Sequence, residues 1–137
     1  MLAVVATLSL LLLAACAAPP AEQALRSTLA SMQAALEQRE PGRFMASVAE
    51  DFAGRDGLDH AQLGRLVRLS LLQNQAISIT TGPLDIQIIG TRATVRFSAV
   101  TTGGSGRFAI DRAGGYQVET AWRLDDGEWL LISADWH

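Results

Sequence analysis

Lysine is absent from this chain, and all 11 of its basic residues are arginine. The 14 acidic residues outnumber them and leave a formal net charge of −3 at pH 7. No segment gathers the arginines into the basic patch that a surface for DNA or RNA needs. We therefore expect no nucleic-acid partner.

Histidine and cysteine are also scarce, with two histidines and one cysteine in 137 residues. His60 lies at the start of a predicted helix and His137 is the last residue, and neither has acidic neighbours at the spacing of metal ligands. No serine lies in a nucleophile-elbow sequence. We therefore expect no metal site and no cofactor. The length of the chain suits a single domain.

The single cysteine follows a long, mostly apolar run over residues 1–15. This run is shorter than the roughly 20 residues that span a bilayer, and it has the length of the hydrophobic region of a signal peptide. Leu13-Ala14-Ala15-Cys16 resembles the bacterial lipobox. In proteins of that class the cysteine carries two or three acyl chains, which anchor a protein stably. The alternatives are an ordinary signal peptide with a chance cysteine, or a buried N-terminal helix.

The resemblance to lipoproteins implies a location as well as an anchor. We expect a signal peptide over residues 1–15, a tether over 16–21 and one folded domain over 22–137. Cys16 is the expected lipid attachment site, which leaves no thiol for a disulfide, a metal or a nucleophile. Ala17 follows the cysteine where aspartate would mark inner-membrane retention, so the expected location is the outer membrane, facing the periplasm.

Apolar residues at helical spacing predict three helices in the first half of the domain. Residues 22–38 carry a stripe of Leu25, Leu29, Met32 and Leu36. A second, short helix opens at Pro41, with one side made of Phe44, Val48 and Phe52. A third begins at a capping box of Asp59 and Gln62 and carries Leu63, Leu66, Val67 and Leu71.

After Ala76 the apolar residues recur every second position, which predicts strands. The first of these segments is interrupted at Gly82-Pro83, and a turn at Gly90-Thr91 leads into a strand over 92–101. The glycine-rich stretch 102–115 is predicted to be a long connection with a short strand extension. Residues 116–124 and 128–136 then form a hairpin around Asp126-Gly127. Helices followed by strands predict an α+β fold, with three N-terminal helices packed on a curved antiparallel sheet of four or more strands.

The chain resembles the nuclear transport factor 2-like superfamily at residues 52–57, 90–95 and 122–129. The resemblance implies a cone-shaped sheet wrapped around three helices. It says little about activity, because this fold serves enzymes, binding modules and assembly proteins alike.

Two registers of the last hairpin are possible, and they place opposite faces inside the cone. A two-residue turn sets Trp122 opposite Leu131, so that the predicted ligand-binding residues line the cavity with Asp135: Tyr116, Thr120, Trp122 and Ser133. A three-residue turn sets Trp122 opposite Leu130, and a different set of side chains then faces the inside of the cone: Leu130, Ile132, Ala134 and Trp136. Superfamily members bring the face equivalent to Trp129 inward, so we prefer the first register. Leu130, Ile132 and Trp136 then form an apolar outer interface for a homodimer or an envelope partner.

Three classes of function fit this sequence. We prefer a non-catalytic envelope lipoprotein that binds a small apolar molecule or a partner chain. An isomerase, dehydratase or cyclase is the first alternative, with Asp135 as general base and Tyr116 as hydrogen-bond donor to a developing oxyanion. A scaffold subunit of an envelope complex is the second. Against the catalytic pair stands the simpler interpretation of Asp135 as a solvated carboxylate and Tyr116 as a packing residue.

Overall fold

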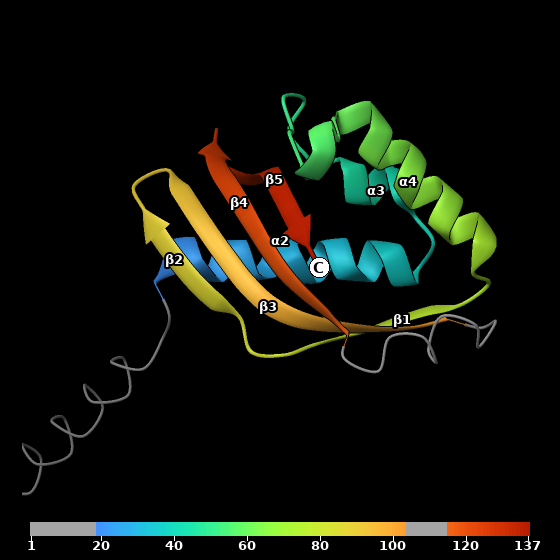
Figure 1. Ribbon diagram of the computed structural model, residues 1–137. Helices are drawn as coiled ribbons and strands as arrows, with labels where there is room; N and C mark the ends of the chain where they lie inside the picture. The colour runs from blue at the N-terminus through green and yellow to red at the C-terminus, as the bar shows by residue number, and fades with distance from the viewer. Residues whose placement is uncertain (1–18, 104–114) are drawn as a thin grey trace, which may run out of the picture.

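The computed structural model describes residues 19–103 and 115–137. The predicted signal peptide, Cys16 and most of the glycine-rich stretch lie outside these residues. The helical elements come first and the strands follow (Figure 1): α2 (Pro20–Glu37), α3 (Pro41–Met45), the 3-10 turn η2 (Arg55–Gly57), α4 (His60–Gln73), β1 (Ile77–Thr81), β2 (Asp85–Ile89), β3 (Arg92–Gly103), β4 (Tyr116–Asp125) and β5 (Glu128–Trp136). This order confirms the predicted α+β class.

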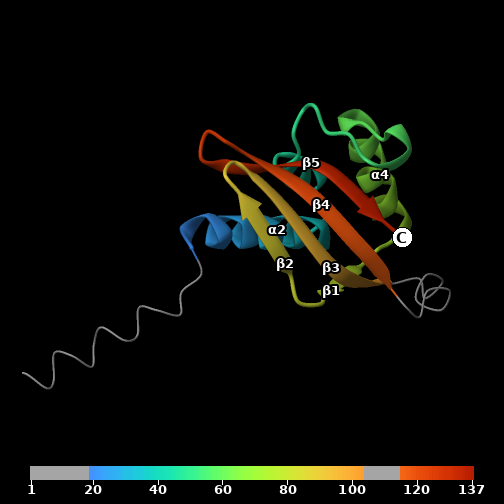
Figure 2. The ribbon, with the colours of Figure 1, turned by 60° about the vertical axis from the view of Figure 1, so that its left-hand side comes forward.

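The strands form one curved antiparallel sheet with the order β1-β3-β4-β5, and β2 also pairs with β3. β1 and β2 pair with successive parts of the long strand β3, so they act as one strand broken at Gly82-Pro83. The amide of Gly82 keeps contact across the break by donating to the carbonyl of Ser98 at 2.8 Å. Figures 1 and 2 show α2 crossing one face of the sheet, with α3 and α4 together at one end of it.

α4 begins at the predicted capping box. The Asp59 carboxylate accepts from the backbone N–H of Gln62 at 2.8 Å, and the Gln62 side chain accepts from the backbone N–H of Asp59 at 2.9 Å. Leu63, Val67 and Leu71 are buried as the spacing predicted. Leu66 instead points outward and is 41% exposed.

The second predicted helix is wrong beyond Met45, where α3 ends. The chain then runs beside β5: the amide of Ala49 donates to the carbonyl of Leu131 at 2.9 Å, and the amide of Leu131 donates to the carbonyl of Ser47 at 2.8 Å. β5 is the last strand of the sheet, and its unpaired backbone groups take these partners. Val48 and Phe52 are still buried, but from an irregular segment and not from a helix.

Arg39 joins the end of α2 to the end of α4. Its backbone has a left-handed conformation, with φ of 63°. Its guanidinium donates to the carbonyls of Asn74 at 2.6 Å and Gln75 at 3.1 Å, and also to the carbonyl of Leu71. These bonds satisfy carbonyls that the C-terminus of a helix leaves without partners.

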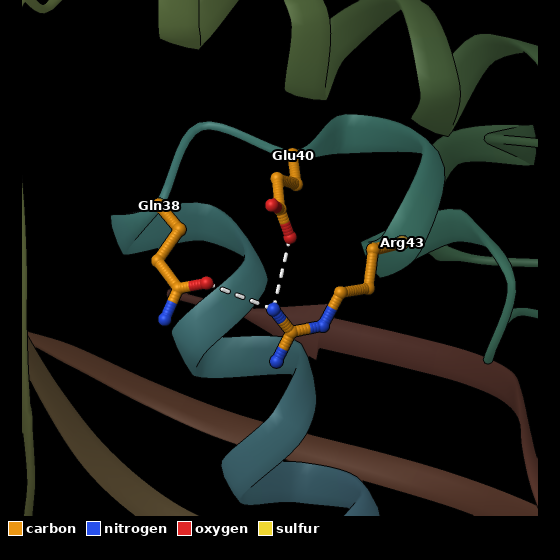
Figure 3. A network of polar contacts seen from close by, with 3 residues as sticks. All are labelled: Gln38, Glu40 and Arg43. Atoms are coloured by element: carbon orange, nitrogen blue, oxygen red, sulfur yellow. Dashed lines mark hydrogen bonds and ion pairs between the residues drawn. The ribbon is translucent and has the colours of Figure 1, made fainter.

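A second arginine closes the turn between α2 and α3 on the surface. Nη1 of Arg43 donates to Oε1 of Gln38 and to Oε2 of Glu40, both at 2.9 Å (Figure 3). Arg43 and Glu40 are both exposed, so water weakens this ion pair. The network fixes a local turn, whereas Arg39 connects two helices.

The core lies between the concave face of the sheet and the helices. Its most completely buried large side chains are Trp122, Leu25 and Val95. Among the residues that the structure describes, every buried side-chain nitrogen and oxygen has a hydrogen-bond partner. Because Trp122, Leu25 and Val95 are each less than 2% exposed, apolar side chains fill the centre of the cone.

Candidate functional site

The hairpin between β4 and β5 has a two-residue turn. Asp126 and Gly127 both have positive φ, 53° and 80°, as a type I′ turn requires. Leu124 pairs with Trp129, and Trp122 pairs with Leu131. The preferred register is therefore confirmed next to the turn.

A β-bulge in β5 then reverses the alternation. Ala121 pairs with Ser133, so Ile132 is an extra residue without a partner on β4. One inserted residue turns every following side chain to the opposite face. Past the bulge, Thr120 faces Ala134 and Val118 faces Trp136.

The bulge corrects three predictions at once. Ser133 and Asp135 were expected on the inner face with Trp122, and the structure puts both on the outer face. Trp136 was expected on the outer face, and it lies on the inner face, half-buried and packed against the core. Of the predicted interface, only Leu130 and Ile132 remain outside, each half-buried.

Thr120 and Trp122 are both buried on the inner face. The Thr120 hydroxyl donates to the carbonyl of Val95 at 3.1 Å and accepts from Nε1 of Trp122 at 2.8 Å. The Thr120 hydroxyl and the Trp122 N–H are therefore bonded within the sheet itself. They stabilise the core at the place where the sequence predicted a bound ligand.

Asp135 and Tyr116 lie on opposite faces of the sheet. Tyr116 is half-buried at the start of β4, on the same side as Thr120. The Asp135 side chain is 58% exposed, with Oδ1 at 3.6 Å from Nη1 of Arg55. The predicted pair of general base and hydrogen-bond donor is therefore not brought together.

The bulge brings Trp136 into an apolar row across three strands. Phe97, Val118 and Trp136 are successive cross-strand partners on the inner face, and all three are half-buried. Beside Trp136 an open groove of about 560 Å³ is lined by Arg55, Asp56, Leu58, Gln62, Leu66 and Trp136. This hollow, here called the Trp136 groove, falls in the size range of small-molecule sites.

The polar side of the Trp136 groove comes from η2. Asp56 and Gly57 both have positive φ, 57° and 77°, so the chain turns tightly at η2. Arg55 of this turn lies next to the end of β5. Nη1 of Arg55 donates to the carbonyl of Trp136 at 3.0 Å. The side chain of Arg55 is 52% exposed, so its charge also faces solvent at the groove.

Sequence reasoning missed the Trp136 groove. Residues 54–57, within the stretch 52–57, were interpreted only as part of the fold resemblance. The Asp56-Gly57 turn was the one available signal, and it indicates a tight turn without saying what lies beside it.

A second hollow, of about 380 Å³, separates α2 from the tip of the last hairpin. Small side chains dominate it, including Ser27, Ser31 and Ser47. Trp129 forms part of its wall and ties the hairpin to the first turn of α2, because its Nε1 donates to the carbonyl of Ala21 at 3.1 Å.

The outer face of the sheet is largely polar. Arg123 binds Asp51 with two hydrogen bonds, of 2.9 and 3.0 Å, and this bonding lowers the pKa of the Asp51 carboxyl below its ordinary value of 3.8. Arg96 pairs with Glu119 at 3.2 Å, and the pKa of this arginine is raised by the bond. The expected apolar outer interface is therefore reduced to a strip around Leu130 and Ile132.

Residues 19–103 and 115–137 contain no group of three or more His, Cys, Asp or Glu side chains placed to hold a metal ion. No helix within the same residues has the length and apolar character needed to cross a bilayer.

No protein-family model matches the sequence. No curated protein matches it either. Solved structures do match the fold. A nuclear transport factor 2-like protein of unknown function from Pseudomonas putida KT2440 superposes with a TM-score of 0.72 at 15% identity, over 85% of this chain and 84% of that one. A protein of unknown function with a cystatin-like fold from Nostoc punctiforme gives a TM-score of 0.65 at 17% identity, over 84% of this chain and 88% of that one.

A third similar structure is a larger protein. Bd1075 of Bdellovibrio bacteriovorus superposes with a TM-score of 0.71 at 11% identity, over 83% of this chain. The chain spans only 39% of the length of Bd1075. Identities this low show the fold alone, and the fold of this chain is the cystatin-like half-barrel of nuclear transport factor 2-like proteins.

Proposed function

We propose that this chain is a lipid-anchored envelope protein whose domain is a non-catalytic binding module, with the Trp136 groove as its binding surface. The observation that carries the proposal is the contrast between a packed cone centre and an open amphipathic groove. Trp122 and Val95 fill the centre, whereas Trp136, Leu58 and Leu66 offer apolar surface beside the exposed charge of Arg55.

The alternatives receive less support from the geometry. Catalysis by Asp135 would need a polar partner within hydrogen-bond reach of the carboxylate, and Tyr116 lies across the sheet from it. A scaffold that assembles through the outer sheet face would have to cover the ion pairs of Arg96 and Arg123. Desolvating such pairs is costly, so the groove is the better candidate for contact.

The lipid anchor fits the start of the folded domain. α2 begins at Pro20, and its first turn is already formed, because the amide of Gln23 donates to the carbonyl of Pro19 at 3.0 Å. Acyl chains on Cys16 would therefore hold the domain within a few residues of the lipid surface. The Trp129 bond to Ala21 would transmit that position to the sheet.

Site-specific photo-crosslinking in cells tests the groove as a binding surface. A photoreactive amino acid replaces Leu58 in the groove, or Thr94 on the outer face of β3, in the full chain. We expect a discrete adduct from position 58 and none from position 94. The adduct should disappear when Trp136→Ala is added, with circular dichroism checking that this variant is folded. Adducts from position 94 alone would refute the groove.

A further inference from the structure

α4 is apolar on two sides, and one of them has no partner in the described part of the chain. Leu63, Val67 and Leu71 are buried against the core. A second stripe is exposed, with Leu66 at 41%, Leu69 at 51% and Leu72 at 80%. Because Leu66 also lines the Trp136 groove, the exposed stripe continues that groove along the helix.

The exposed side of α4 is also positively charged. The helix sequence, HAQLGRLVRLSLLQ, contains no acidic residue. Arg65 and Arg68 are exposed, and with 3.6 residues per turn they lie on either side of Leu72. Neither arginine has a carboxylate within ion-pair distance among residues 19–103 and 115–137. We call this surface of Leu66, Leu69, Leu72, Arg65 and Arg68 the basic leucine face.

We propose that the basic leucine face docks an acidic amphipathic helix of a partner protein, an inference that rests on the proposed role as a binding module. Amphipathic helices present apolar residues at such spacings to a partner surface. Carboxylates on the partner would neutralise Arg65 and Arg68, as electrostatic complementarity across an interface requires. The partner would then reach the Trp136 groove through Leu66.

Charge and position both favour this occupant over two others. A second copy would bring four arginines together, because two α4 helices packed face to face supply no carboxylate. The other occupant is a membrane surface, and an anchor at Cys16 would precede the N-terminal end of α2 in the chain. α2 is about 27 Å long at 1.5 Å per residue. Arg39 holds α4 near the C-terminal end of α2, whereas the anchor precedes the N-terminal end of α2 (Figures 1 and 2).

A charge-swap experiment with the full chain tests the proposal. The probes are two fluorescent helical peptides with the same leucine stripe, one flanked by glutamates and one by lysines, and binding is measured by anisotropy. We expect the glutamate peptide to bind at least tenfold more tightly than the lysine peptide. The double variant R65E/R68E should reverse this preference, while Arg92→Glu on the outer sheet face should leave it unchanged. Leu72→Ser should weaken binding of the glutamate peptide several-fold.

Other outcomes overturn the proposal. Failure of both peptides to bind removes it. The proposal is also overturned if the Cys16→Ser chain binds vesicles of phosphatidylcholine and phosphatidylglycerol at 7:3, provided that R65E/R68E abolishes this binding and that the peptides do not compete with the vesicles. A dimer in sedimentation that Leu72→Ser dissociates assigns the face to a second copy instead. The Leu58 crosslinking test is independent, so the groove and the basic leucine face can fail separately.

Discussion

At the scale of single residues, Thr120 satisfies two buried polar groups with one hydroxyl. It donates to the carbonyl of Val95 and accepts from the indole N–H of Trp122. We predict that Thr120→Val lowers the free energy of unfolding by about 1–3 kcal/mol, because the Trp122 N–H is left buried without an acceptor. Urea denaturation followed by tryptophan fluorescence measures the change.

Thr80 on β1 provides the matched control, since its side chain is exposed. Thr80→Val should change the unfolding free energy by no more than about 0.5 kcal/mol. If Thr120→Val were equally mild, the hydroxyl would not be the group that holds the indole in place.

Asp51 makes stability depend on pH. Its bonds to Arg123 lower the carboxyl pKa below 3.8 in the folded protein. A lowered pKa stabilises the fold above the unfolded value, and this contribution is lost as the pH falls through the folded one. Asp51→Asn should therefore be less stable than the wild type at pH 7, with the difference shrinking below about pH 4.

Urea denaturation at pH 7, 5 and 3 measures this convergence. Glu50→Gln, at an exposed neighbouring position, is the control and should show no comparable pH dependence. A deficit of Asp51→Asn that stays constant down to pH 3 would mean that the ion pair does not contribute as the geometry indicates.

At the scale of elements, the sequence correctly predicted the start of α4 and the last hairpin turn, because the signals for both are local. The capping box of Asp59 and Gln62 starts α4 where expected, and Asp126-Gly127 makes the expected turn. The bulge in β5 was not predictable from alternation, because Trp129, Leu130, Leu131 and Ile132 are all apolar. A run of this kind permits either face to be buried, and the register is decided by its neighbours.

α3 was predicted too long for a related reason. Val48 and Phe52 fit a helical spacing, but the segment that contains them pairs with β5, more than 75 residues further along the chain. Local periodicity carries no information about such a partner. The Trp136 groove depends on the same kind of long-range contact, which is why the sequence did not predict it.

Arg39 connects the end of α2 to the end of α4, so its substitution should destabilise both helices. We predict that Arg39→Ala lowers the free energy of unfolding by about 1–2 kcal/mol, because carbonyls at the C-terminus of α4 lose a charged donor. Thermal denaturation provides the measurement.

Arg43→Ala is the control for this prediction. It removes an exposed network and should cost at most about 0.5 kcal/mol. Arg39→Gly distinguishes the backbone conformation of residue 39 from its hydrogen bonds, since glycine adopts the positive φ without supplying the guanidinium donor. Because glycine also relieves the strain of the left-handed backbone, only an Arg39→Gly variant about 1 kcal/mol more stable than the wild type would show that the hydrogen bonds contribute nothing.

At the scale of the whole molecule, attachment at Cys16 should decide where the protein resides. We predict that Cys16→Ser, exported behind a cleavable signal peptide in place of residues 1–15, moves the chain from the membrane pellet to the soluble fraction of disrupted cells, because the acyl chains are lost. Mass spectrometry of the wild-type N-terminal peptide should show the added lipid. Co-sedimentation of Cys16→Ser with the membrane pellet, undiminished by high salt, would refute the anchor.

The contact between Arg55 and Trp136 joins residues that are 81 positions apart. Contacts of such separation cost more loop-closure entropy than local contacts do. A chain that crosses a membrane unfolded and emerges with its N-terminus first would receive β5 last, and β5 supplies both core residues and Trp136 of the groove. Binding would then begin only when the final strand has docked, so an incompletely delivered molecule would be silent toward its partner.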